Sequence, residues 1–123
     1  MSNEEITEQI REINTLPEEK QRHLYGECDK WCIENFEDGL EIVAIMESDN
    51  HENGITHSYL RNPENKLCYD VRGEKGCDEE VIAYTGVDYF NDDIEEYIFD
   101  NIYDFKKFLK WVEFEVVREG YLG

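Results

Sequence analysis

The sequence has little positive charge, few prolines and no long apolar run. Lysine and arginine total 12 against 31 aspartates and glutamates, which gives a formal net charge of −19. Because Lys and Arg supply nearly all the affinity of proteins for phosphate backbones, this balance excludes a direct nucleic-acid binder. The longest apolar run, Ile42 to Met46, has five residues, whereas a membrane span needs about 20. We therefore expect no membrane-spanning segment.

A secretory leader is not expected either, because Met1 is not followed by a basic and then an apolar segment. The protein is therefore expected in the cytoplasm. Two prolines and eight glycines are too few for a linker-rich chain, and 40% hydrophobic with 13% aromatic residues can build a core despite the charge. The length of 123 residues fits a single domain, 1–123.

The four cysteines allow three interpretations. Disulfide bonds are disfavoured in a reducing cytoplasm. A zinc site would combine Cys28 and Cys32 with Cys68 and Cys77, but eight residues separate the second pair, whereas structural zinc ligands are usually separated by about two to four. The remaining interpretation is one reactive cysteine and three buried or incidental ones, with no metal or other cofactor.

Apolar periodicity and turn residues predict helices first, then mostly a sheet, then a long helix, which is an α+β arrangement. Helices are expected at 2–14, 17–25, 28–36, 78–84 and 102–116, and strands at 40–47, 56–61, 66–71 and 94–98. Asn101, with Asp104 three residues later, is a typical cap for the last helix. We expect N-terminal helices packed on a small antiparallel sheet with the C-terminal helix, and Trp31, Phe36 and Trp111 in the core.

The two strands at 56–61 and 66–71 flank a turn sequence at 62–65, which predicts a β-hairpin. A four-residue loop would pair Arg61 with Lys66, Leu60 with Leu67, Tyr59 with Cys68 and His57 with Asp70. Directly opposed side chains have Cβ atoms about 4.5–5.5 Å apart. This register would place the His57 imidazole within hydrogen-bonding reach of the Asp70 carboxylate.

Cys28 is the candidate nucleophile, with His57 as its base and Asp70 as the group that orients the imidazole. It begins a predicted helix, where unpaired backbone N–H groups and the helix dipole favour a thiolate. The flanking carboxylates of Glu27 and Asp29 act in the opposite direction and raise the pKa of a thiol. In the alternative interpretation Cys28 is a small buried hydrophobe, and the histidine and aspartate form a structural pair.

Three motifs follow one another along the chain: Gly26-Glu27-Cys28 at a helix start, His57 on a strand, and Tyr69-Asp70 with Gly73 behind it. Over residues 24–112 this order resembles papain-like and transglutaminase-like thiol enzymes, and more closely small proteins of phages and mobile elements. The resemblance implies a papain-like core and a thiol hydrolase or acyl-transfer protein. Such enzymes commonly hold an oxyanion donor just upstream of the nucleophile, where Gln21 is the amide candidate.

The acidic residues are concentrated between residues 74 and 104, where eleven are Asp or Glu and Lys75 is the one basic residue. A solvated face explains such a run most simply. Carboxylates interleaved with aromatic residues can also imitate phosphates and occupy a basic surface on a protein partner. The alternative function is thus a non-catalytic acidic protein, a nucleic-acid mimic that inhibits a host defence system such as restriction or CRISPR in the host cytoplasm. The expected partner-binding residues are Glu79, Glu80, Asp88, Asp92, Asp93, Glu95 and Glu96.

Overall fold

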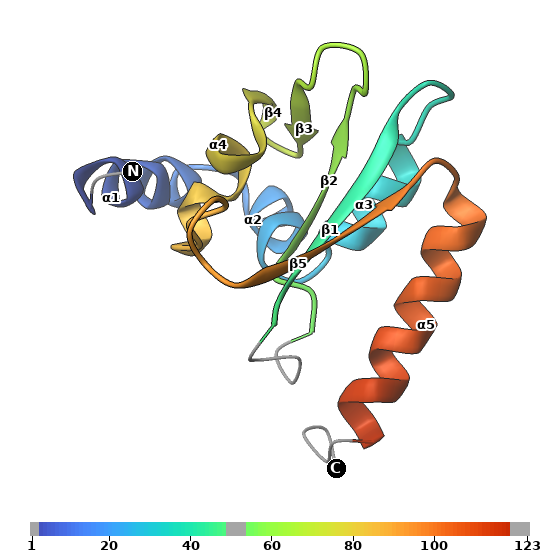
Figure 1. Cartoon of the computed structure of the whole chain (residues 1–123). Helices are drawn as coiled ribbons and strands as arrows, with labels where there is room; N and C mark the ends of the chain where they lie inside the picture. Colours follow the sequence, from blue (N-terminus) through green and yellow to red (C-terminus); the bar gives the residue numbers. More distant parts are fainter. Residues whose placement is uncertain (1–2, 49–53, 119–123) are drawn as a thin grey trace.

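The computed structural model describes residues 3–48 and 54–118, and these residues form five α-helices and a five-stranded antiparallel sheet (Figure 1). The helices are α1 (Asn3–Asn14), α2 (Glu18–Tyr25), α3 (Cys28–Asn35), α4 (Asp78–Ile82) and α5 (Ile102–Arg118), and the 3-10 turn η2 (Ala83–Thr85) continues α4. The strands are β1 (Glu41–Glu47), β2 (His57–Arg61), β3 (Cys68–Asp70), β4 (Gly73–Gly76) and β5 (Ile94–Phe99). Their order in the sheet is β4-β3-β2-β1-β5. The predicted α+β class is therefore confirmed.

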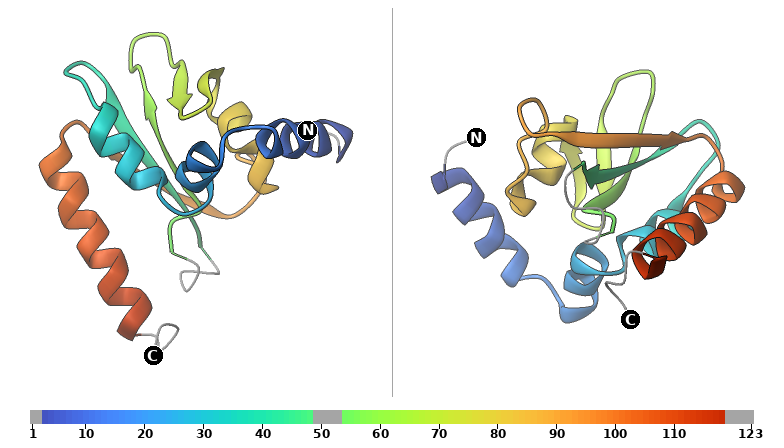
Figure 2. Two further views of the ribbon diagram at one scale, coloured as in Figure 1. Left: turned by 180° about the vertical axis from the view of Figure 1, so that it is seen from behind. Right: turned by 60° about the horizontal axis from the view of Figure 1, so that its bottom comes forward.

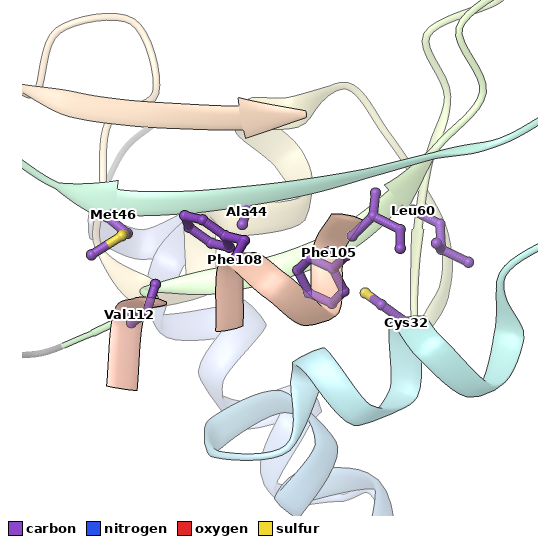
Figure 3. Close-up of a cluster of buried hydrophobic side chains, with 8 residues drawn as sticks. Cys32, Ala44, Met46, Leu60, Phe105, Phe108 and Val112 are labelled. Atoms are coloured by element: carbon purple, nitrogen blue, oxygen red, sulfur yellow. The ribbon is translucent and has the colours of Figure 1, made fainter. Parts of the chain in front are cut away.

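One face of the sheet packs against α3 and α5. Side chains alternate between faces along a strand, so the even-numbered residues of β1 and Leu60 of β2 point towards these two helices. Phe105 is fully buried in this layer. Figure 2 shows α3 and α5 on the same side of the sheet, and Figure 3 shows the buried side chains between these helices and the strands. The buried members of this cluster are Cys32, Ile42, Ala44, Met46, Leu60, Phe105, Phe108 and Val112.

The opposite face of the sheet is covered by α4 and η2. Its buried cluster comprises Val43, Ile45, Tyr59, Cys68, Val81, Ile82 and Val87. The helix α1 does not follow the predicted arrangement, because its principal neighbour is η2 rather than the sheet. Ile13 of α1 packs with Leu24 and Tyr84 in a separate small cluster, and α1 consequently projects away from the strands (Figure 2).

The predicted hairpin register is wrong by two residues. Leu60 is opposite Tyr69 and Arg61 is opposite Cys68. The four-residue loop is 63–66 rather than 62–65, because the backbone N–H of Asn62 donates to the carbonyl of Leu67 at 2.9 Å. The side chain of Asn62 accepts a hydrogen bond from the backbone of Glu64 at 2.9 Å. The last residue of the loop, Lys66, adopts a left-handed conformation with φ of 64°. A shift of two residues keeps every side chain on its predicted face, so His57 and Asp70 still share a face but as diagonal neighbours.

Two further differences concern β4 and Trp111. The strand β4 was not predicted, because it starts and ends with glycine and has no β-branched residue to suggest a strand. Trp111 is 42% exposed, which contradicts its expected core position, whereas Trp31 and Phe36 are half-buried against the cluster beneath α5.

Asn101 caps α5 as predicted, accepting a hydrogen bond from the backbone of Asp104 at 2.8 Å. Among the helices described, none has the length and apolar character needed to cross a membrane.

Candidate functional site

Cys28 is the first residue of α3, as the sequence predicted. The chain turns sharply between α2 and α3, because the backbone N–H groups of Gly26 and Glu27 both donate to the carbonyl of Arg22 at 2.9 Å. The side chain of Glu27 makes no hydrogen bond that caps α3. Cys28 as a whole is half-buried.

His57 is the first residue of β2 and is fully buried. Its Nε2 atom lies 3.2 Å from Oδ2 of Asp70, so the diagonal register still brings the imidazole and the carboxylate together. Its Nδ1 atom lies 3.0 Å from the hydroxyl of Tyr84. Both ring nitrogens of this buried histidine therefore have hydrogen-bond partners.

Asp70 is held by Arg72 as well as by His57. The guanidinium Nη2 of Arg72 lies 2.7 Å from Oδ2 of Asp70, and the backbone N–H of Arg72 donates to Oδ1 at 2.8 Å. Burial raises the pKa of Asp70, but hydrogen bonds and charges from His57 and Arg72 outweigh it and lower the pKa below its ordinary value. The site therefore holds an ionised carboxylate against the imidazole.

Cys28 and His57 shift each other's pKa in the directions that favour an ion pair. Burial raises the pKa of Cys28, but the neighbouring His57 and its charge outweigh this effect and bring the pKa below the ordinary 9.0. Burial lowers the pKa of His57, but the hydrogen bond with Asp70 and the nearby Cys28 bring the pKa above the ordinary 6.5. The flanking acids Glu27 and Asp29 therefore do not decide the direction of the shift.

The other described cysteines differ from Cys28. Cys32, one helical turn further on, is fully buried, and burial together with the charge of Cys28 raises its pKa. Burial and Asp78 raise the pKa of Cys68 to about 12, and Cys77 is exposed. In the described part of the chain no three His, Cys, Asp or Glu residues form a group that could hold a metal ion.

Gln21 does not lie where an oxyanion donor is needed. Its side-chain amide donates to the carbonyl of Leu16 at 2.8 Å and to that of Asn14 at 3.4 Å. These bonds hold the connection between α1 and α2 in place, so the role of Gln21 is structural.

Three residues of the site were missed by the sequence interpretation: Tyr84, Arg72 and Ser58. Tyr84 reaches His57 from 27 positions further along the chain, and no local pattern signals such a contact. Arg72 did leave a signal, because an aspartate two residues before an arginine can accept from both its backbone and its side chain. Ser58 follows His57 directly on β2, and its buried hydroxyl has no hydrogen-bond partner among the described residues.

An open pocket of about 350 Å³ borders Cys28. It lies between the start of α3, the segment leading into β2, and the second half of α5. Its lining consists of Leu24, Gly26, Cys28, Asp29, Ile55, Thr56, Leu109, Lys110, Val112 and Glu113. Of the three candidate catalytic residues, Cys28 belongs to this described lining, and His57 is fully buried.

The predicted partner-binding acids lie on α4, in the loop before β5 and on β5 itself. Several use their oxygens within the protein. Asp88 accepts hydrogen bonds from the backbone of Phe90 and Asn91 at 3.1 and 3.2 Å, and Glu96 accepts from the hydroxyl of Tyr89. Glu95 likewise accepts from Tyr97 at 2.6 Å. The inhibitor function stays a prediction of the sequence.

Comparison of the chain with protein-family models, with curated proteins and with solved structures found no match. The likeness to papain-like and transglutaminase-like thiol enzymes thus stays an interpretation of the sequence motifs.

Proposed function

We propose that this protein is a thiol enzyme of the hydrolase or acyl-transfer class with a papain-like arrangement, in which Cys28 is the nucleophile, His57 its base and Asp70 the orienting carboxylate. One observation carries the proposal: the pKa of a half-buried cysteine is lowered, against the effect of burial, by a histidine hydrogen-bonded to a buried aspartate. A thiol needs such a partner to be a nucleophile at neutral pH.

The hydrogen bonds around His57 support a protonated imidazole. In that form both ring nitrogens donate, Nε2 to Asp70 and Nδ1 to the oxygen of Tyr84. The tyrosine hydroxyl can then donate its own proton to the carbonyl of Leu24, 3.0 Å away. Every donor in this series of hydrogen bonds has an acceptor, which supports a stable proton on His57.

The start of α3 supplies candidate donors for an oxyanion. The first N–H groups of an α-helix have no intrahelical partner, and the side chain of Glu27 makes no capping bond. The backbone N–H groups of Cys28 and Asp29 are therefore proposed to stabilise the negative oxygen formed when the sulfur attacks a carbonyl. Gln21 is not needed for this role.

Alkylation by iodoacetamide at neutral pH, followed by peptide mapping, tests the activation of Cys28. Cys77 is an internal control, because it is an exposed thiol in the same molecule. We expect Cys28 to react faster than Cys77 by about tenfold or more although it is less accessible, since reactivity follows the thiolate fraction. The His57→Gln variant should lose this advantage.

A burst experiment with p-nitrophenyl acetate tests the covalent step. We expect a rapid release of one p-nitrophenolate per chain and an acetyl group on Cys28, and neither in Cys28→Ala. If Cys77 is alkylated faster than Cys28 and no burst occurs, the proposed function is wrong, and Cys28 is then a structural residue.

A further inference from the structure

The imidazole of His57 does not reach the described lining of the pocket beside Cys28. The ring is fully buried, and its two nitrogens lie against Asp70 and Tyr84. The pocket is bordered by Cys28 and by Thr56, the residue before His57, while the described residues of its lining do not include the histidine. Neither ring nitrogen is therefore placed to donate a proton to a group at the described lining of the pocket.

This arrangement restricts the leaving group. Cleavage of an amide needs a general acid, because an amine must be protonated as it departs. A thiolate leaves without a proton at neutral pH, because a thiol is a far stronger acid than an amine. A buried, fully hydrogen-bonded histidine thus suits a thioester substrate and is poorly suited to a peptide bond.

The pocket restricts the acyl group. Four aliphatic side chains form its walls: Leu24, Ile55, Leu109 and Val112. Its volume of about 350 Å³ lies at the lower end of the range of about 300–1,000 Å³ found for small-molecule sites. Such walls favour an aliphatic chain of several carbons.

The charges around the pocket disfavour an anionic acyl group. Two carboxylates, Asp29 and Glu113, and one ammonium, Lys110, contribute to the lining. The chain as a whole carries −19, and a field of this sign lowers the local concentration of anions. A terminal carboxylate on the acyl chain would therefore enter less readily than a methyl group.

From these observations we infer that Cys28 accepts an uncharged aliphatic acyl group from a thioester, with the acyl chain lying in the pocket between α5 and the segment before β2. This inference rests on the proposed function and specifies its substrate. The Cys28 thiolate forms a C–S bond to the carbonyl carbon, the C–S bond to the donor breaks, and the electron pair leaves with the donor as a thiolate. His57 keeps its proton, and no oxidant or other co-reactant is required.

Three thioesters of N-acetylcysteamine test the acyl group, with the full-length protein and intact-mass detection of acyl-Cys28. The probes are the S-hexanoyl, S-acetyl and S-glutaryl compounds, the last of similar length to hexanoyl but anionic. We expect hexanoyl transfer to exceed acetyl transfer by about tenfold or more, as burial of extra methylene groups in an apolar pocket implies. Glutaryl transfer should be no faster than acetyl transfer. Hexanoyl p-nitroanilide, the matched amide, should not acylate Cys28.

Pocket-filling variants locate the acyl group. Leu109→Phe and Ile55→Phe should each lower the ratio of hexanoyl to acetyl rates, because the added ring volume occupies the place of the chain. Ile98→Phe is the matched control, since Ile98 is exposed on β5 and outside the pocket lining, and it should leave the ratio unchanged. Two filling variants are used so that one misfolded protein, detected by circular dichroism, does not decide the result.

The possible results separate this inference from the proposed function. If iodoacetamide alkylates Cys28 preferentially but no thioester acylates it, the thioester inference is wrong and the activated thiol stands. If the p-nitroanilide acylates Cys28 as fast as the thioester, His57 does protonate leaving groups and the inference is overturned. Equal rates for the hexanoyl, acetyl and glutaryl probes, or equal effects of Leu109→Phe and Ile98→Phe, would contradict the assigned pocket.

Discussion

The hydroxyl of Tyr84 lies 3.0 Å from Nδ1 of His57 and also donates to the carbonyl of Leu24 at 3.0 Å. One side chain therefore connects η2, the first residue of β2 and the last turn of α2. Because α2 leads directly into the helix that begins with Cys28, Tyr84 fixes the imidazole relative to the segment that carries the sulfur.

Replacing Tyr84 by Phe tests this connection. The ring still fills its place, but the carbonyl of Leu24 and Nδ1 of His57 lose a buried partner. We expect a loss of about 1–3 kcal/mol in the free energy of unfolding, the usual cost of unpaired buried polar groups, measured by urea denaturation. Tyr103→Phe is the matched control, because Tyr103 is 67% exposed. Equal stability of the two variants would show that the Tyr84 hydroxyl is not needed.

The acid limb of the stability curve should depend on Asp70. Its pKa in the folded protein is lowered below the ordinary 3.8, because hydrogen bonds and charges from His57 and Arg72 outweigh the opposing effect of burial. A lowered folded pKa contributes stability that is present above the unfolded pKa and lost as the pH falls through the folded pKa. Asp70→Asn should therefore reduce stability at neutral pH and flatten its decline in acid.

Urea denaturation at a series of pH values measures this dependence. The exposed turn residue Asp38 provides the control Asp38→Asn, which should keep the shape of the wild-type curve. A wild-type acid limb that Asp70→Asn leaves equally steep would contradict the assigned role of the buried carboxylate. The measured quantity is the slope of unfolding free energy against pH, which is independent of any catalytic assay.

The alternation of side chains along strands could be predicted from the sequence, but the pairing of strands could not. His57 and Asp70 were expected on one face, and the two-residue error in register preserved that result because the period of a strand is two. The error itself arose in the turn, where Asn62 and Lys66 use side-chain hydrogen bonding and a left-handed backbone. The alternation of polar and apolar residues does not predict such local interactions within a turn.

The position of Cys28 was predictable for a different reason. A glycine before an amphipathic segment marks a helix boundary, and the boundary alone places the cysteine at the first position of α3. Tyr84 could not be found in this way, because its contact with His57 depends on how η2 packs over the sheet. Long-range packing also explains Trp111, whose helical spacing fits the apolar stripe of α5 although its side chain lies at the edge of the core.

The pH dependence of Cys28 alkylation should reveal its pairing with His57. In the folded protein the pKa of Cys28 is lowered and that of His57 is raised, so the thiolate should persist well below the ordinary thiol value of 9.0 and disappear as the pH falls through the lowered pKa of Cys28. In His57→Gln the effect of burial, which raises the pKa of Cys28, is no longer opposed by the imidazole. We expect the alkylation midpoint of this variant to move to higher pH.

Cys77 again provides the reference within the same protein, because the variant leaves its exposed surroundings unchanged. A midpoint for Cys28 that coincides in wild type and in His57→Gln would mean that the imidazole does not hold the thiolate. The profile is read from the mass of the modified peptides, so it needs no knowledge of a substrate.

The packing of α5 determines whether the pocket exists, because Leu109 and Val112 form part of its wall. Phe105 anchors this helix, since it is fully buried and its ring centroid lies 5.5 Å from that of Phe99 on β5. Phe105→Ala should cost about 3–5 kcal/mol of unfolding free energy, the range for a large buried ring, and Phe105→Leu should cost less. Phe90→Ala removes a ring that is 70% exposed and should change stability by no more than about 0.5 kcal/mol. If urea denaturation gave similar values for Phe105→Ala and Phe90→Ala, α5 would not be anchored on the sheet, and the pocket beside Cys28 would lack its outer wall.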